Sequence, residues 1–364
     1  MKGPSEFPRE DFASDNHAEA HPAVLAALQA AAHGPAPAYG GDRWTAAAEA
    51  GLRDLAGPAA VPLLVFNATA ANVLGLSVLL GPGDAIICAE HSHLAMDECG
   101  AVEAMLGRKL LPVPAPDGKL TPAAIEALLQ RCTDVRTPRP STVALTQATE
   151  LGTCYTLAEL AELREFCDRR GLRIHMDGAR LANAVAHLNC EVADIARFAD
   201  ALSFGFTKNG ALGVDALLLM TPGTAERAPY LRRQQGQLAS KMRFLAAQVT
   251  ALVDGGLWLD NARHANGMAG HLAAELEPLP GLRLTQRVQS NAVFVELPRA
   301  AADSLRERWA FHLSPTGEAR LMTSHATGRT DVSDLVAEVK TCLKQGENAG
   351  GPPFGRRTGA RRVR

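Results

Sequence analysis

The chain has 364 residues, with 39 acidic and 37 basic side chains and a formal net charge of −2. This length predicts about two domains. The near-zero charge argues against a nucleic-acid-binding protein, which usually carries a strongly basic domain. Hydrophobic residues make up 47% of the chain, so a large core can form without disulfides or structural metals.

The cysteines and the first residues indicate the cellular compartment. The seven cysteines are scattered, odd in number and free of any C-x-x-C pair, so neither a disulfide framework nor a zinc knuckle is expected. Residues 1–16 contain no apolar run of the kind that a secretory signal requires. The sequence therefore predicts a cytoplasmic protein with reduced thiols and no metal.

Residues 61–80 carry no charge over a length that could cross a membrane. However, Pro62, Asn67 and Asn72 lie within this stretch, and a lipid-facing helix would leave such groups poorly satisfied. No basic cluster flanks the segment. We therefore expect a buried strand, a polar turn and a buried helix here, and no membrane partner.

Short apolar runs alternate with helical patterns through the middle of the chain. Almost wholly apolar runs are typical of strands that are buried on both faces of a mostly parallel sheet. Between them, stretches such as 157–170 repeat leucine or phenylalanine every three residues, which indicates helices packed on that sheet. The alternation predicts a three-layer α/β/α domain. The expected strands are 63–66, 85–88, 110–113, 142–146, 172–176, 201–205 and 215–220.

The pattern changes after Gly255 and Gly256, where one long helical pattern and then several short strand patterns follow. This change predicts a small α+β domain at the C-terminal end. Residues 355–364 contain five arginines and no acid, so the rest of the chain carries a net charge of −7. The expected organisation is a disordered segment at 1–11, a large domain at 12–255, a small domain at 256–345 and a disordered basic tail at 346–364.

Two candidate functional residues lie directly after expected strands, where ligands bind in open α/β sheets. Asp177 ends one strand, which suits either a functional carboxylate or an ordinary helix cap. His175 and Asp177 share a strand face, but two ligands without a third make a weak metal site. Lys208 follows the next strand and suits either a solvated surface lysine or a Schiff-base nucleophile.

The turn at 67–72 also follows a strand and opens a helix, whose first N–H groups would suit a phosphate. Neither G-x-x-x-x-G-K-[ST] nor G-x-G-x-x-G opens this helix, which disfavours a nucleoside triphosphate or a dinucleotide. A phosphate cradle, Asp177 and Lys208 at the strand ends of one sheet are the groups that pyridoxal phosphate needs. The lysine would bind this cofactor, and the aspartate would keep its ring nitrogen protonated.

Several segments together resemble the low-specificity L-threonine aldolases, a family within the β-eliminating-lyase group of pyridoxal phosphate enzymes. The most specific segments are HMDGAR, beginning at His175, and SFGFTKNG, beginning at Ser203, and the similarity runs from about Phe12 to Leu335. The resemblance implies a PLP-dependent transferase-like large domain of fold type I, with three α/β/α layers, and the small α+β domain at its C-terminal end. Family habit implies a homotetramer built from dimers.

The resemblance also assigns residues to the cofactor. Lys208 would bind it covalently, Asp177 would pair with its ring nitrogen, and His93 would stack on the ring and take part in acid–base chemistry. The alternative for His93 is a structural histidine. Ala68 and Thr69 would hold the phosphate. Ala68 stands where the family usually has glycine, and if the turn required a positive φ, alanine would cost about 1 kcal/mol or more.

The resemblance places a second set of residues on the substrate side. Arg180, Arg320 and Ser14 would bind the substrate carboxylate, which a bidentate arginine fork suits well, and Arg180 would also lie near the cofactor. Tyr39 would form a wall of the site that is reached across a subunit interface.

The implied reaction is retro-aldol cleavage of L-threonine, L-allo-threonine or a related β-hydroxy-α-amino acid to glycine and an aldehyde. His93, directly or through water, would remove the β-hydroxyl proton. Other reactions on the same scaffold are phenylserine cleavage, β-elimination and transamination. An alternative of another class is a binding protein that keeps the fold without turnover.

Overall fold

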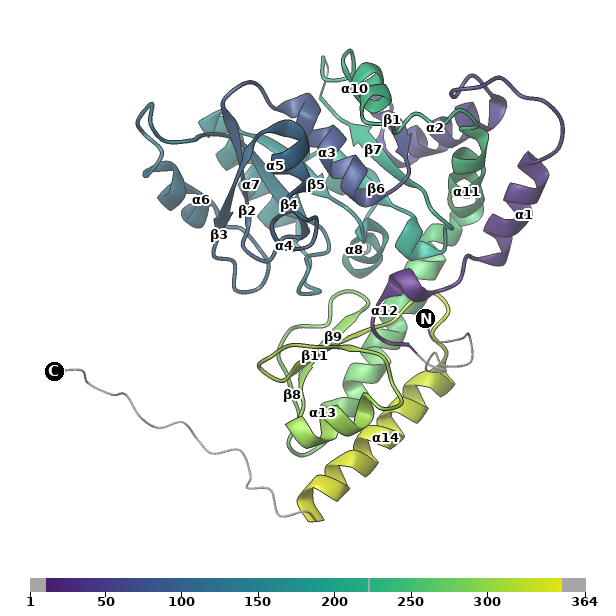
Figure 1. Cartoon of the computed structure of the whole chain (residues 1–364), viewed down its shortest axis with the longest axis vertical. Coiled ribbons are helices and arrows are strands. Elements are labelled where there is room, and N and C mark those ends of the chain that lie inside the picture. The colour runs from purple at the N-terminus through teal and green to yellow at the C-terminus, as the bar shows by residue number, and fades with distance from the viewer. Residues whose placement is uncertain (1–10, 222, 349–364) are drawn as a thin grey trace.

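The computed structural model describes residues 11–221 and 223–348, and this part of the chain contains two β-sheets (Figure 1). The larger sheet has seven strands in the order β1-β7-β6-β5-β4-β2-β3. Only β7 runs opposite to the other strands of this sheet. Its strands are β1 (Val61–Val65), β2 (Asp84–Ala89), β3 (Lys109–Val113), β4 (Arg139–Thr146), β5 (Arg173–Asp177), β6 (Ala201–Gly205) and β7 (Asp215–Leu219). All seven expected strands are present.

Helices cover both faces of this sheet, because its central strands are apolar on both sides. Helix α3 packs on β5, β6 and β7, whereas α2, α7, α9 and α11 contribute to a separate core on the other face. The predicted three-layer architecture is therefore confirmed. The α-helices of this region are α1 (Pro22–Ala31), α2 (Arg43–Ala56), α3 (Ala68–Leu79), α4 (His93–Met96), α5 (Ala101–Leu106), α6 (Pro122–Leu129), α7 (Leu157–Arg170), α8 (Leu181–Leu188), α9 (Val192–Ala196), α10 (Ala228–Gln234) and α11 (Arg243–Val253). The 3-10 helices are η2 (Asp15–His17), η3 (Thr207–Asn209) and η4 (Asp254–Gly256).

The uncharged stretch at 61–80 forms β1 and then α3, as its polar turn predicts. Asn67 is the N-cap of α3, and its side chain accepts a hydrogen bond from the Ala70 N–H at 2.8 Å. Among the described residues, no helix is both long and apolar enough to cross a membrane.

The smaller sheet is antiparallel throughout, in the order β10-β11-β9-β8. Its two-residue strand β10, which the sequence did not predict, pairs with β11. The strands are β8 (Arg283–Leu284), β9 (Ala292–Glu296), β10 (His312–Leu313) and β11 (Glu318–Met322), and the helices beside them are α12 (Leu257–Leu276), α13 (Arg299–Leu305) and α14 (Arg329–Asn348).

Helix α12 contributes to the cores of both sheets. Trp258 and Ala262 lie in the core of the larger sheet, and Leu272 and Leu276 lie in that of the smaller sheet. A change of domain at 255/256 therefore stays a prediction. The segments predicted to be disordered lie mostly outside the described residues, and so does the basic run at 355–364. Asp11, however, forms a β-bridge with Ala310, and α14 continues three residues past 345.

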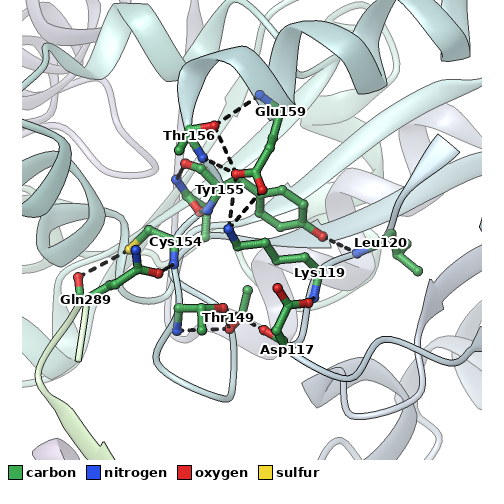
Figure 2. Close-up of polar contacts among 11 residues, drawn as sticks. Asp117, Lys119, Leu120, Thr149, Cys154, Tyr155, Thr156, Glu159 and Gln289 are labelled. Atoms are coloured by element: carbon green, nitrogen blue, oxygen red, sulfur yellow. Dashed lines mark hydrogen bonds and ion pairs between the residues drawn. The ribbon is translucent and has the colours of Figure 1, made fainter. Parts of the chain in front are cut away.

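A polar network fixes the loop between β4 and α7 (Figure 2). The buried Tyr155 hydroxyl accepts a hydrogen bond from the Leu120 N–H at 2.6 Å. The Cys154 N–H donates to Oε1 of Gln289 at 3.0 Å, which ties the loop to the segment before β9. Glu150 lies in this loop, and its Oε1 accepts a hydrogen bond from the Thr146 hydroxyl at 2.9 Å.

Candidate active site

Asp177 is the last residue of β5, and Lys208 follows the neighbouring strand β6. The backbone segments after these two strand ends approach each other very closely. A Cβ on Gly178 would lie 2.1 Å from a backbone oxygen of β6, and one on Gly205 would lie 2.3 Å from the carbonyl oxygen of Ala179. No side chain fits at such distances, so only glycine allows this approach. The two glycines therefore bring both candidate residues to one place at the sheet edge.

A cavity of about 190 Å³ opens at this edge. Four residues that the sequence analysis assigned to the cofactor, Lys208, His93, Ala68 and Thr69, line it. The complete lining is Asn16, Phe66, Asn67, Ala68, Thr69, His93, Ala179, Thr207, Lys208 and Asp215.

Lys208 lies in η3 and is half-buried, so it is not the solvated surface lysine of the alternative interpretation. Burial lowers the pKa of Lys208, and the positive charge of Arg180 lowers it further, against the opposite effect of nearby carboxylates such as Asp15 and Asp177. A lowered pKa makes the neutral amine more available, which is what a lysine nucleophile needs.

Asp177 is buried, and its two carboxylate oxygens have separate donors. The Asn72 amide nitrogen lies 2.8 Å from Oδ2, and the Ala179 N–H lies 2.9 Å from Oδ1. Helix α8 begins only at Leu181 and has Arg180 as its N-cap. Asp177 is therefore not the cap of that helix, which was the alternative interpretation.

His93 begins α4 and contacts two glutamates. Its backbone N–H donates to Oε1 of Glu150 at 2.7 Å, and its ring Nδ1 lies 3.0 Å from Oε1 of Glu98. The hydrogen bond to Glu98 raises the pKa of His93. Because an ionised carboxylate only accepts hydrogen bonds, the shared hydrogen belongs to Nδ1, and Nε2 of the neutral ring is free to accept a proton. His91, in contrast, is exposed and does not line the cavity.

The start of α3 forms one end of the cavity. Ala68 is the first residue of this helix, so its backbone is helical and not left-handed. The expected cost of alanine in place of glycine therefore does not arise, which corrects the sequence-based expectation. The positive end of the helix dipole at Ala68 and Thr69 suits a phosphate.

Arg180 makes a bidentate contact with Asp15, which the sequence analysis did not identify. Nε and Nη2 of Arg180 lie 2.7 and 2.9 Å from the two oxygens of Asp15. The Asn291 amide donates to the same carboxylate at 3.0 Å. Burial alone would raise the pKa of Asp15, but the Arg180 guanidinium outweighs burial and lowers it.

Arg320, on β11, is held less firmly. Its Nη2 lies 3.5 Å from the Ala13 carbonyl oxygen, and its buried Nε has no hydrogen-bond partner among the described residues. Ser14 follows Ala13, and its Oγ accepts a hydrogen bond from the Asn16 N–H at 3.1 Å. No carboxylate of residues 11–221 and 223–348 forms an ion pair with Arg320, so this guanidinium is available to an anionic ligand.

Tyr39 is half-exposed and does not line the cavity of its own chain. Arg233 lies over its ring, 5.1 Å from the ring centre. Its role across a subunit interface therefore stays a prediction.

Asp215 is a further site residue that the sequence analysis missed. Its Oδ1 accepts hydrogen bonds from the Phe206 N–H at 2.7 Å and the Thr207 N–H at 3.1 Å. The buried carboxylate thus fixes the turn that carries Lys208. Burial raises the pKa of Asp215 to about 6.

Other missed residues include Asp15, Asn72, Glu98 and Glu150. Each resembles an ordinary polar residue in a single sequence, because at least one of its partners lies far along the chain. Asp15 and Arg180, for example, are 165 positions apart. The one local signal is the carboxyl end of a strand or the start of a helix, which many polar residues share.

Substitutions at Asp215 test this account of the Lys208 turn. Asp215→Asn keeps an oxygen acceptor for both N–H groups, whereas Asp215→Ala leaves two buried donors unsatisfied and should cost about 2–4 kcal/mol. Urea unfolding of the cofactor-free variants at neutral pH should therefore rank asparagine above alanine in stability. Equal stabilities would contradict the assigned hydrogen bonds.

The pH dependence of the same proteins gives a second check. A folded-state pKa near 6 lies above the ordinary aspartate value, so folded wild type takes up this proton first as pH falls. Wild type should therefore gain stability relative to Asp215→Asn as the pH falls from 7 to 4. A constant difference over this range would show that Asp215 titrates normally.

Comparison with known proteins is consistent with this geometry. The model of the β-eliminating lyase family matches residues 11–299. The low-specificity L-threonine aldolase of Pseudomonas sp. strain NCIMB 10558 is 40% identical over 92% of this chain and 98% of its own, and that of Pseudomonas aeruginosa is 41% identical over the same shares. A solved threonine aldolase structure from Leishmania major is 30% identical, covers 92% of this chain and 99% of its own, and superposes with a TM-score of 0.86. The chain therefore belongs to the β-eliminating lyase family and has the PLP fold type I.

Proposed function

We propose that this chain cleaves β-hydroxy-α-amino acids, L-threonine and L-allo-threonine first among them, to glycine and an aldehyde. The observation that carries this proposal is that Lys208, His93 and the start of α3 line one cavity, with Asp177 at the adjoining strand end. The activities named for the two Pseudomonas relatives support it.

Pyridoxal phosphate, the cofactor of this family, fits the residues present. Lys208 offers a half-buried amine with a lowered pKa, and Thr69 stands in the first turn of a twelve-residue helix that suits a phosphate. Asp177 accepts hydrogen bonds from neutral donors and would pair with the ring nitrogen. When bound, the cofactor supplies an electron sink for the carbanion that forms at Cα.

His93 would take the proton of the substrate β-hydroxyl. Its Nδ1–H is held by Glu98, so the proton would be received at Nε2 and the positive charge that develops would face a carboxylate. The alternative of a purely structural histidine is less consistent with a half-buried ring that lines the cavity.

Arg320 would bind the substrate carboxylate, with Ser14 close by on the same segment as Ala13. Two nitrogens of Arg180 already bind Asp15, which leaves Nη1 for the substrate or cofactor. A carboxylate held at a fixed point would determine which bond at Cα is perpendicular to the cofactor ring and so overlaps with its π orbitals. Orientation of this kind determines which bond breaks.

We further propose a cytoplasmic homotetramer in which Tyr39 reaches the cavity of a neighbouring subunit. The side chains of Tyr39, Phe66 and Tyr230 are exposed, and Phe66 also lines the cavity. All seven cysteines are free, which suits a reducing compartment. Light scattering on the purified protein should give four times the mass of one chain, and a monomer would contradict the proposal.

A product assay tests the proposed reaction directly. Incubation with L-threonine, L-allo-threonine or L-phenylserine, with and without added pyridoxal phosphate, should yield glycine and the matching aldehyde in equal amounts. Lys208→Ala should lower turnover at least about 10³-fold, since it removes the nucleophile. Lys340→Ala, on the exposed side of α14, is the matched control and should remain active. Ammonia with a keto acid would instead indicate β-elimination, and a keto acid without ammonia would indicate transamination.

Arg320→Lys tests the carboxylate site. Lysine keeps the charge but loses the planar fork, so KM for L-threonine should rise about 10- to 100-fold, with a smaller change in kcat. Arg299→Lys, an exposed arginine paired with Asp303 on α13, serves as the control. An unchanged KM in the Arg320 variant would place the substrate carboxylate elsewhere.

A further inference from the structure

Asn72 is a fully buried residue of α3 that joins the two halves of the site. Its Nδ2 lies 2.8 Å from Oδ2 of Asp177 and 2.9 Å from Oε1 of Glu98. The same Glu98 oxygen accepts the hydrogen bond from His93. One amide group therefore lies between the carboxylate assigned to the cofactor ring and the carboxylate that holds the proposed base.

The orientation of this amide follows from its partners. Ionised carboxylates only accept hydrogen bonds, so the amide nitrogen must face Asp177 and Glu98, and the amide oxygen must face His175, whose Nε2 lies 3.0 Å away. His175 consequently carries its hydrogen on Nε2 and donates it to Asn72. Burial lowers the pKa of His175 to about 4, so this ring stays neutral at physiological pH.

Close packing keeps His175 against the amide. A Cβ on Gly75, one helical turn after Asn72, would lie 2.8 Å from the His175 ring atoms Cε1 and Nδ1. The ring therefore packs directly on the backbone of α3. With its oxygen held by His175, the Asn72 amide has both hydrogens left for the two carboxylates.

We propose that Asn72 is a positioning residue for the reaction, which holds the carboxylates of Asp177 and Glu98 in place through one amide group and so couples the partner of the cofactor ring to the base His93. This proposal rests on the roles that the proposed function gives to Asp177 and His93. It assigns a task to a residue that touches neither the substrate nor the reacting atoms.

The physical reason is the cost of two neighbouring buried negative charges. Like charges in one site push at least one carboxyl toward its neutral form unless donors hold them ionised. Glu98 has a fully buried side chain, and its Oε2 has no partner among the described residues, so Asn72 and His93 carry its stabilisation. Around His93, the other charged groups are Asp177, Lys208 and Glu150.

Removal of the amide should therefore change the pKa of His93, although Asn72 does not contact His93 directly. In Asn72→Leu, Glu98 loses the amide donor that holds its Oε1 opposite the His93 ring. A Glu98 carboxylate that is no longer held against Nδ1 favours the charged imidazole less, so the pKa of His93 should fall by about one unit or more. Asn72→Asp keeps the shape but replaces the donor with a third carboxyl, which repels the other two once it ionises.

The first measurement is an NMR titration of histidine ring protons in the cofactor-free protein, with the His93 signal identified by its loss in His93→Asn. Asn72→Leu should lower the His93 pKa, and Glu98→Gln should do the same if the leucine variant fails to fold. Ser77→Ala is the matched control, because Ser77 is another buried polar residue of α3 and its hydroxyl donates within the helix to the Leu74 carbonyl oxygen. It should leave the titration unchanged.

The second measurement is the equilibrium affinity for pyridoxal phosphate between pH 6 and pH 9. Asn72→Asp should bind the cofactor at least about tenfold more weakly than wild type, and its deficit should grow with pH as the new carboxyl ionises. The deficit of Asn72→Leu should stay constant with pH.

These readouts separate the coupling role from a merely structural one. A wild-type His93 titration in folded Asn72→Leu, or an equal shift in Ser77→Ala, would overturn the proposal, as would a pH-independent deficit in Asn72→Asp. Failure of the proposed function gives a different result. Wild type would then form no aldol products, but the expected changes in His93 titration and in cofactor affinity would still be seen in the Asn72 variants.

Discussion

The active site depends on holding four buried carboxylates beside one lysine and two arginines at a single edge of the large sheet. An isolated buried charge is very costly, so each acid needs donors matched to the form in which it works. The donors differ from one acid to the next. Asp15 has the fork of Arg180, whereas Asp177, Glu98 and Asp215 have amide or imidazole N–H groups.

This difference affects the charge states of Asp15 and Asp215 in opposite directions. At Asp15, the effect of the Arg180 guanidinium outweighs that of burial, so the pKa of Asp15 is lowered and the carboxylate stays ionised. At Asp215, burial prevails over the backbone N–H groups of Phe206 and Thr207 that donate to it and over the charge of Lys208, and its pKa rises to about 6. Burial thus favours the neutral form of the acid beside the Lys208 turn, whereas the acid paired with Arg180 stays charged. Asp15 satisfies Arg180, whereas Arg320 has no acidic partner within residues 11–221 and 223–348.

The sequence predicts those parts of this arrangement that depend on local pattern. Apolar runs between helical patterns give all seven strands, because burial of a strand on both faces is visible in its own residues. Asp177 and Lys208 stand out for the same reason, as polar residues at the ends of such strands, and family resemblance adds His93. The hydrogen-bond partners of these residues, in contrast, cannot be predicted from local pattern. Asn72 meets Glu98 and Asp177 across 26 and 105 positions, and only packing brings them together.

The two sheets meet at the substrate side of the site through the first described residues of the chain. The Phe12 N–H donates to the Ala310 carbonyl oxygen, and the Met322 N–H donates to the Phe12 carbonyl oxygen, so this segment lies along the small sheet beside Arg320. Three residues later, Asp15 binds Arg180 at the end of β5 in the large sheet. A substrate carboxylate at Arg320 and Ser14 would therefore lie where a single short segment links the two sheets. If the substrate carboxylate binds at Arg320 as proposed, a displacement of one sheet relative to the other would change its distance from Lys208, and the contacts of Phe12 and Asp15 would oppose that displacement.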